Sequence, residues 1–174
     1  HKEYRRQRQM CIRDRSLVAS LIDRNGEQNT ERWAKSLVEN FARKPQGNDR
    51  AQIMAVANGE ADLAIANSYY VGIMLSGDAG EEQLNAAKKV KLVFPNQLSS
   101  GAHINISGAG ILKYAPNVEN ANLFIEFLLS DRVQESMVKK SYEYPVAKVP
   151  ISDEMASFET CLLYTSDAAD DTPC

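Results

Sequence analysis

The sequence contains few of the residues that build most catalytic and metal sites. Among its 174 residues there are two histidines, three cysteines and one tryptophan. The cysteines, Cys11, Cys161 and Cys174, lie near the two ends. Residues 16–159 contain no Gly-rich phosphate loop, no Cys or His cluster at zinc spacing and no GxSxG nucleophile motif. An enzyme is therefore not expected, and no local motif supports a catalytic triad around His103.

Two further absences limit the possible partners. No apolar run approaches the ~20 residues that a membrane-spanning helix needs. The formal net charge is −3, so no general excess of basic residues favours nucleic acid as a partner. The arginines at the N-terminal end are the exception, since such a cluster is typical of an arm that binds nucleic acid or a membrane surface.

The two ends have a second explanation, as translated sequencing adapter. Residues 5–14 read RRQRQMCIRD and residues 161–170 read CLLYTSDAAD. One DNA string, read on its two strands in different frames, encodes both segments, and the match continues into the residues outside them. We therefore expect 1–15 and 160–174 to be adapter-derived, disordered tails, and we exclude them when predicting the fold. No cysteine then remains, which agrees with an exported protein.

Helical and extended patterns succeed one another between these ends. Apolar spacing, with Asn, Asp, Ser and Gly at the boundaries, predicts helices over 16–25, 28–42, 49–58, 81–89, 118–129 and 131–140. Short apolar or alternating runs predict strands over 62–66, 90–94 and 103–113. One face of the second helix carries four large apolar residues that we interpret as core: Trp33, Leu37, Val38 and Phe41.

The most informative stretch is residues 62–70, which read DLAIANSYY. It predicts a short buried strand that leads into a helix capped by Asn67 or Ser68, with Tyr69 and Tyr70 in the first turn. Backbone N–H groups and the helix dipole favour negative charge there. A phenol normally titrates near ~10, but a bound cation can deprotonate it, and phenolate suits a hard trivalent metal. The competing interpretation is a pair of half-buried packing aromatics.

Three segments together resemble one protein family. DLAIANSYY, HINISGAGILKYAPN at 103–117 and YEYPV at 142–146 are similar in order and spacing to the periplasmic ferric-iron-binding proteins of ABC importers. The resemblance covers about residues 16–150 and implies an α/β fold, the incomplete C-terminal part of a two-lobed type II periplasmic-binding protein. It implies that Tyr69 and Tyr70 are phenolate ligands of Fe(III), and that Asn67 is a candidate contact for a synergistic anion.

The resemblance also implies a complete function. The parent protein would capture Fe(III) in the periplasm as a monomer and deliver it to an ABC transporter permease, with its signal peptide outside this fragment. Further ligands would come from the missing N-terminal part, so the fragment alone should bind iron weakly. We expect His103, Tyr142 and Tyr144 to be structural rather than ligands. The alternative is a protein of the same fold for an anion or small organic solute, with the tyrosines as pocket walls.

The family's two lobes suggest a division of the chain. A second-lobe segment with the tyrosine pair is expected over 16–102, an inter-lobe crossover strand over 103–113, first-lobe helices over 114–141 and a return segment over 142–159. Helix geometry adds one condition, because adjacent helical residues point about 100° apart. Both phenols should reach one ion only if Tyr69 has non-helical backbone at the helix entrance.

Overall fold

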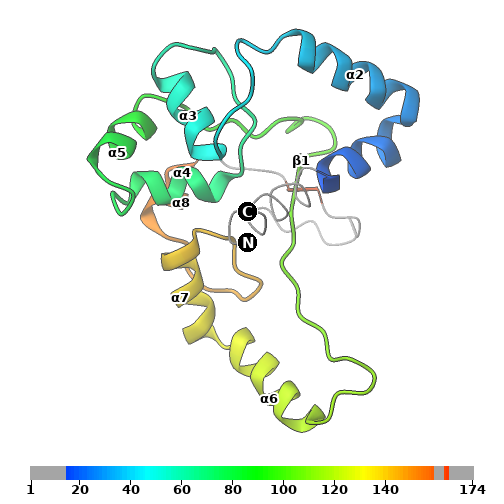
Figure 1. The fold of residues 1–174 in the computed structure, drawn as a ribbon. Helices are drawn as coiled ribbons and strands as arrows, with labels where there is room; N and C mark the ends of the chain where they lie inside the picture. The colour runs from blue at the N-terminus through cyan, green and yellow to red at the C-terminus, as the bar shows by residue number, and fades with distance from the viewer. Residues whose placement is uncertain (1–14, 159–162, 165–174) are drawn as a thin grey trace. The chain divides into compact units, whose positions relative to one another are not determined.

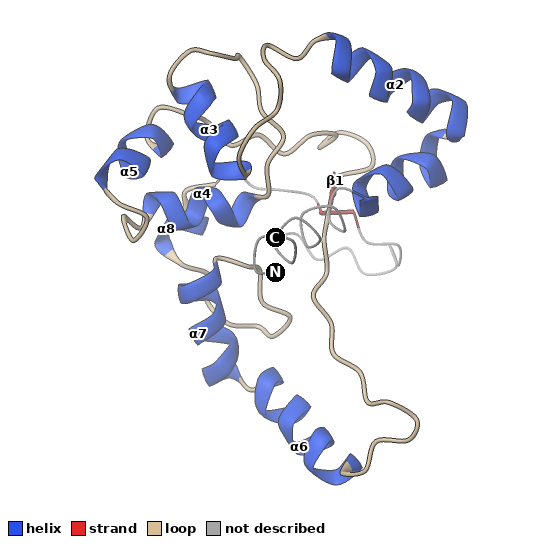
Figure 2. Ribbon diagram, in the orientation of Figure 1, coloured by secondary structure: helices blue, strands red, loops and turns tan. Residues whose placement is uncertain are grey.

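The computed structural model describes residues 15–158 and 163–164. Within this part, the chain divides into two compact units. Unit 1 takes in residues 15–45, 94–107 and 163–164, and unit 2 takes in residues 46–93 and 108–158. Helices and irregular connections account for nearly all of both units (Figure 2). No helix in the described part of the chain is both long and apolar enough to cross a membrane.

Unit 2 carries the tyrosine pair and consists of short helices joined by loops (Figure 1). These helices are α3 (Asp49–Ala57), α4 (Ser68–Leu75), α5 (Glu81–Ala87), α6 (Val118–Leu129), α7 (Asp131–Ser141) and α8 (Asp153–Ala156). The first three share a hydrophobic cluster, whose buried members are Ile53, Val71, Met74, Ala86 and Ala87. Sequence patterns predicted all of these helices except α8. Where both ends of a helix were predicted, each end lies within two residues of the observed one.

Helix α4 also joins a second hydrophobic cluster. Its Tyr69 and Ile73 pack against Val138 of α7, Tyr142 at the end of α7 and Met155 of α8, all three of which are buried. An eight-residue helix would be marginally stable in isolation. Packing against two clusters therefore decides where α4 lies and how it is oriented.

Unit 1 consists of a helix over residues 15–25, α2 (Glu27–Glu39), β1 (Ala102–His103) and β2 (Leu163–Tyr164). Gly26 separates the two helices with φ 79°, a left-handed conformation that glycine adopts without strain. The two strands pair in parallel, with Ala102 opposite Leu163 and His103 opposite Tyr164. The first helix follows the prediction, whereas α2 ends three residues before the predicted limit.

The predicted core face of α2 is mostly exposed. Trp33, Val38 and Phe41 are all exposed, and Thr30 is the buried residue of this helix. The apolar spacing was interpreted correctly as helical, but the prediction that this face is core is wrong for the described structure. Periodicity identifies the face that a helix can bury, whereas burial also needs a neighbouring element to cover it.

The three predicted strands are also largely absent. Residues 62–66 and 90–94 form no strand, and within 103–113 the structure has only the end of β1 at His103. Leu63 and Ile106 are 87% and 78% exposed. A strand needs neighbours to satisfy its backbone groups and to cover its apolar side chains. Among the described residues, β1 and β2 are the paired strands, so the other apolar runs lack partners.

The observed units differ from the predicted division of the chain. The predicted segment 16–102 is split between both units, and α7, predicted to lie in the other lobe, packs on α4 in the unit that carries the tyrosines. Two residues of the predicted disordered tail, Leu163 and Tyr164, form β2. An open strand edge pairs readily with any apolar extended segment, which explains this pairing physically. The rest of both predicted tails, apart from Arg15, lies outside the described residues.

Gly72 allows the closest approach between α4 and the end of α7. A Cβ atom at Gly72 would lie 2.6 Å from Cβ of Tyr142 and 2.7 Å from its Cγ. Tyr142 cannot easily move aside, because it is buried and has left-handed backbone with φ 55° at the C-cap of α7. The absence of a side chain at position 72 is therefore required by packing.

We expect the substitution Gly72→Ala to lower the free energy of unfolding by up to about 2 kcal/mol. Overpacking costs typically about 1–3 kcal/mol, and the ~1 kcal/mol that alanine gains over glycine as a helix former offsets only part of it. Denaturant unfolding of the whole chain measures this change. Gly108→Ala is the matched control, since a Cβ atom added at Gly108 would have nothing within 4 Å. A stabilised Gly72→Ala variant would show that α4 and α7 are not in close contact.

Candidate functional site

Tyr69 and Tyr70 are the second and third residues of α4. Their ring centroids lie 4.2 Å apart, and the ring planes are tilted by 35°. Both side chains are half-buried: Tyr69 packs against the cluster around Val138, and Tyr70 packs against the cluster around Met74. The structure therefore brings the two predicted ligands together at the start of one helix.

The backbone condition predicted at Tyr69 is not met in the described structure. Helix α4 begins at Ser68, so Tyr69 is helical rather than extended. The ring centroids nevertheless lie close together, since each tyrosine side chain can rotate about two torsions. A regular helix start is thus compatible with two neighbouring phenol rings.

Asn67 occupies the N-cap position of α4 without capping it through its side chain. Its backbone N–H and its Nδ2 both donate hydrogen bonds to Oδ2 of Asp49, at 2.9 and 2.8 Å. The prediction that Asn67 caps α4 by accepting an N–H group is therefore wrong. The amide instead connects the start of α4 to the start of α3, where Asp49 is the first helical residue.

Asp49 is the residue that sequence reasoning missed at this site. The sequence predicted it as the cap of α3, whereas the neighbouring Asn48 makes that bond by accepting from the backbone N–H of Ala51 at 3.2 Å. Asp49 and Asn67 are eighteen residues apart and belong to no common motif. The only signal in the sequence was an acidic residue at a helix start, which is common in proteins.

The weaker ligand candidates have structural roles in the described residues. Tyr142 is buried against α4, and Tyr144 packs on the same cluster. His103 lies on β1 in unit 1, where its Nε2 is 3.2 Å from Oγ of Ser16, and Ser16 Oγ also donates to Oδ1 of Asn105. These contacts agree with the expectation that all three residues contribute to packing or hydrogen bonding.

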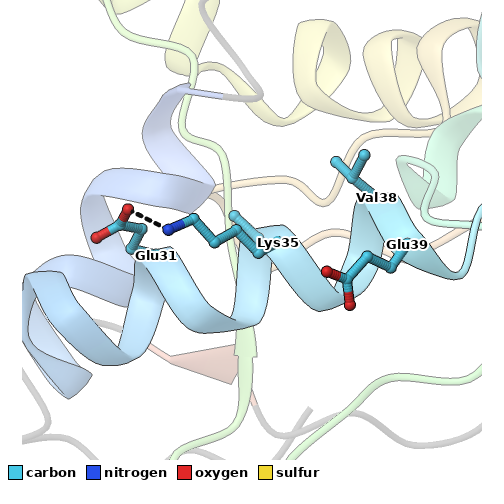
Figure 3. A pocket seen from close by; sticks show the side chains of 5 residues that line it. Glu31, Lys35, Val38 and Glu39 are labelled. Atoms are coloured by element: carbon cyan, nitrogen blue, oxygen red, sulfur yellow. Dashed lines mark ion pairs between the residues drawn. The ribbon is translucent and has the colours of Figure 1, made fainter.

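The common metal-ligating residue types do not cluster elsewhere in the described part of the chain. The described residues contain no group of three or more His, Cys, Asp or Glu residues placed to hold a metal ion. A hollow on α2 is lined by residues of that one helix: Glu31, Ala34, Lys35, Val38 and Glu39 (Figure 3). Its Glu31–Lys35 ion pair of 2.7 Å joins two exposed side chains one helical turn apart and contributes little stability. The tyrosine pair therefore remains the candidate site.

Comparison with protein families and individual proteins identifies several relatives of this chain. The profile of a family described as bacterial extracellular solute-binding protein matches residues 14–172. The chain is 51% identical over 146 residues to iron uptake protein A1 of Synechocystis sp., which covers 83% of this chain and 40% of the relative. It is 31% identical over 129 residues to the major ferric iron-binding protein of Neisseria meningitidis, covering 74% and 37% respectively.

Solved structures resemble this chain over most of its length. A Trichodesmium protein in complex with iron and citrate ligands superimposes with a TM-score of 0.79 at 46% identity, over 86% of this chain and 47% of that protein. Apo FutA2 from Synechocystis superimposes with a TM-score of 0.78 at 45% identity, over 86% and 48%. The chain thus spans less than half the length of each of these relatives.

The caps of α3 and α6 provide a test of the local structure near the site. Asn48 and Asn117 both occupy N-cap positions, but only the Asn48 side chain accepts a hydrogen bond from its helix. We expect Asn48→Ala to lower the free energy of unfolding by about 1 kcal/mol, the usual loss for such a cap. Asn117→Ala should change it by a few tenths of a kcal/mol at most. Equal losses in denaturant unfolding would contradict the observed difference between the two caps.

Proposed function

Because the chain belongs to the bacterial extracellular solute-binding protein family and has part of the type II periplasmic-binding-protein fold, we propose that its parent protein captures Fe(III) and delivers it to an ABC importer. The observation that carries this proposal is the adjacent pair of phenol rings, 4.2 Å apart at the start of α4. The proposed Fe(III) ligands are Tyr69 and Tyr70, both as phenolates. The relatives named for iron uptake and ferric iron binding support the same ion.

Chemistry favours a trivalent cation at this position. Phenolate is a hard oxygen donor, and a highly charged cation is needed to displace a proton that normally leaves near ~pH 10. Two phenolates do not fill the coordination shell of iron. The described residues supply no cluster of His and carboxylate ligands, so the remaining donors would lie outside the described residues. This chain alone should therefore bind Fe(III) weakly.

The proposed partner is the membrane permease of an ABC transporter, and the proposed location is the periplasm. A relative from Serratia marcescens is named as an Fe(3+)-binding periplasmic protein, which supports the location. The parent would act as a monomer and without nucleic acid. It would not be an enzyme, a proposal supported by relatives that are named for iron uptake and ferric iron binding.

The role of Asn67 as a contact for a synergistic anion is the weaker part of this proposal. Its backbone N–H and Nδ2 donate to the carboxylate of Asp49. A carboxylate that already accepts these hydrogen bonds also repels a second anion. Anion binding at Asn67 would therefore require these hydrogen bonds to rearrange, whereas phenolate binding to a cation would not.

A second candidate function is the binding of an anion or small organic solute by the same fold, with the tyrosines as pocket walls. The Trichodesmium structure contains citrate together with iron, which is the observation that favours this alternative. Half-buried aromatic rings are also suitable walls for an organic ligand. The two functions differ in whether the phenol oxygens bind the metal directly.

Addition of Fe(III), supplied as a soluble chelate, to the whole chain should separate the two functions. Direct ligation should produce a visible phenolate-to-iron charge-transfer band, with saturation only at high iron concentration because the site is incomplete. We expect Tyr69→Phe and Tyr70→Phe each to lower the iron affinity at least about tenfold, or ~1.4 kcal/mol. Absorbance titrations measure both the band and the affinity.

Tyr114→Phe is the matched control, since Tyr114 is 86% exposed. An equal loss of the band in this variant would indicate unspecific binding to surface phenols. Binding of citrate without a band, unaffected by iron, would favour the organic solute. A tight one-to-one coloured complex of this chain would show that two phenolates and solvent are sufficient, contrary to the weak binding we expect.

A further inference from the structure

Asp49 makes the hydrogen bonds that hold the entrance of α4. Its Oδ2 accepts from the backbone N–H of Asn67 at 2.9 Å and from Asn67 Nδ2 at 2.8 Å. Both bonds are charge-assisted, and such bonds are roughly twice as strong as bonds between neutral groups. One carboxylate oxygen thus fixes both the backbone and the side chain of the residue that immediately precedes α4.

No strand holds this part of the backbone in the described structure. Residues 62–65 are exposed and form no strand, so the chain enters α4 without a sheet beside it. Asn67 has extended backbone, with φ −78° and ψ 137°, and its side chain does not cap α4. The hydrogen bonds to Asp49 therefore add to the packing of α4 against its two hydrophobic clusters in fixing where the first turn begins.

The tyrosine pair lies close after Asn67 in the chain. Tyr69 and Tyr70 are two and three residues after Asn67, and the backbone N–H of Tyr70 donates to the carbonyl of Asn67 at 3.2 Å. A rotation of Asn67 would change the direction of the first turn and hence the relation between the two rings. A metal site loses affinity steeply when its supporting residues allow its ligands to move.

We propose that Asp49 is a positioning residue for the Tyr69–Tyr70 pair, acting through Asn67 and without contact to the ion. This inference rests on the proposed function for its role in iron binding. The geometric part, in which Asp49 fixes the two rings, is independent of iron. Asp49 differs from a mere stabiliser of α3, because its hydrogen bonds go to the other helix.

The metal-free chain tests the geometric part. Two aromatic rings 4.2 Å apart contribute a coupled signal to the near-ultraviolet circular dichroism spectrum, defined here as the wild-type spectrum minus that of Tyr69→Phe. In the Asp49→Ala background, the difference that Tyr69→Phe makes to the spectrum should be less than half of the wild-type difference. Asp49→Asn should retain an intermediate value, because its carbonyl oxygen still accepts hydrogen bonds but without the negative charge. All spectra are recorded where unfolding measurements show each variant to be fully folded.

Two control variants separate positioning from general effects. Asp62→Ala removes an exposed negative charge from the segment that precedes α4 in the sequence, and Asn48→Ala removes the cap of α3 while leaving Asn67 unchanged. Both should retain the tyrosine signal. The proposal is overturned if Asp49→Ala keeps the wild-type signal, or if Asn48→Ala loses as much, because the effect would then be a loosening of α3.

Iron titrations complete the test. Asp49→Ala should lower the Fe(III) affinity at least about fivefold, ~1 kcal/mol, relative to Asp62→Ala. If the wild-type chain gives no charge-transfer band while Asp49→Ala still loses the dichroism signal, the proposed function fails and the positioning role stands. If iron binds equally well to Asp49→Ala and to wild type, the proposed function stands and the positioning role in binding fails.

Discussion

The packing of α4 between two hydrophobic clusters is the interaction on which the rest of unit 2 depends. Helices α3 and α5 cover its Val71 and Met74, and Met74 is completely buried. Helices α7 and α8 cover Tyr69 and Ile73. The two tyrosines are therefore positioned by contacts along the whole helix and not only by their immediate neighbours. A candidate site on the first turn of such a helix is more rigid than one on a loop.

Several apolar side chains outside this packing are exposed. Leu63, Ile65 and Val93 have the spacing of strand residues, yet they are exposed and the segments are irregular. Helix α6 has no buried residue and exposes Leu123, Phe124 and Phe127. Monomeric proteins rarely expose so many large apolar side chains. The chain spans less than half the length of the relatives it matches.

The sequence was sufficient to predict the helices, because helix formation depends largely on local residue preferences. Helices α3 to α7 were predicted from capping residues and apolar spacing, and the tyrosine pair was predicted as a site because it stood in a recognisable pattern. The strands could not be predicted correctly, because an apolar alternation does not reveal whether a neighbouring strand exists. The contact of Gly72 with Tyr142 and the bonds of Asp49 to Asn67 join residues far apart in the chain, and no local signal marks them.

The charges around the start of α4 favour the proposed cation over an anion. A helix N-terminus alone favours anions by about 0.3–1 kcal/mol, and the exposed N–H groups of the first turn can bind them. Here the carboxylate of Asp49 already accepts the hydrogen bond from Asn67 next to that end. Its negative charge offsets the helix dipole and disfavours a second free anion nearby. Under the proposed function, the two phenols in this turn would become effective ligands only when a strongly charged cation displaces their protons, as Fe(III) can.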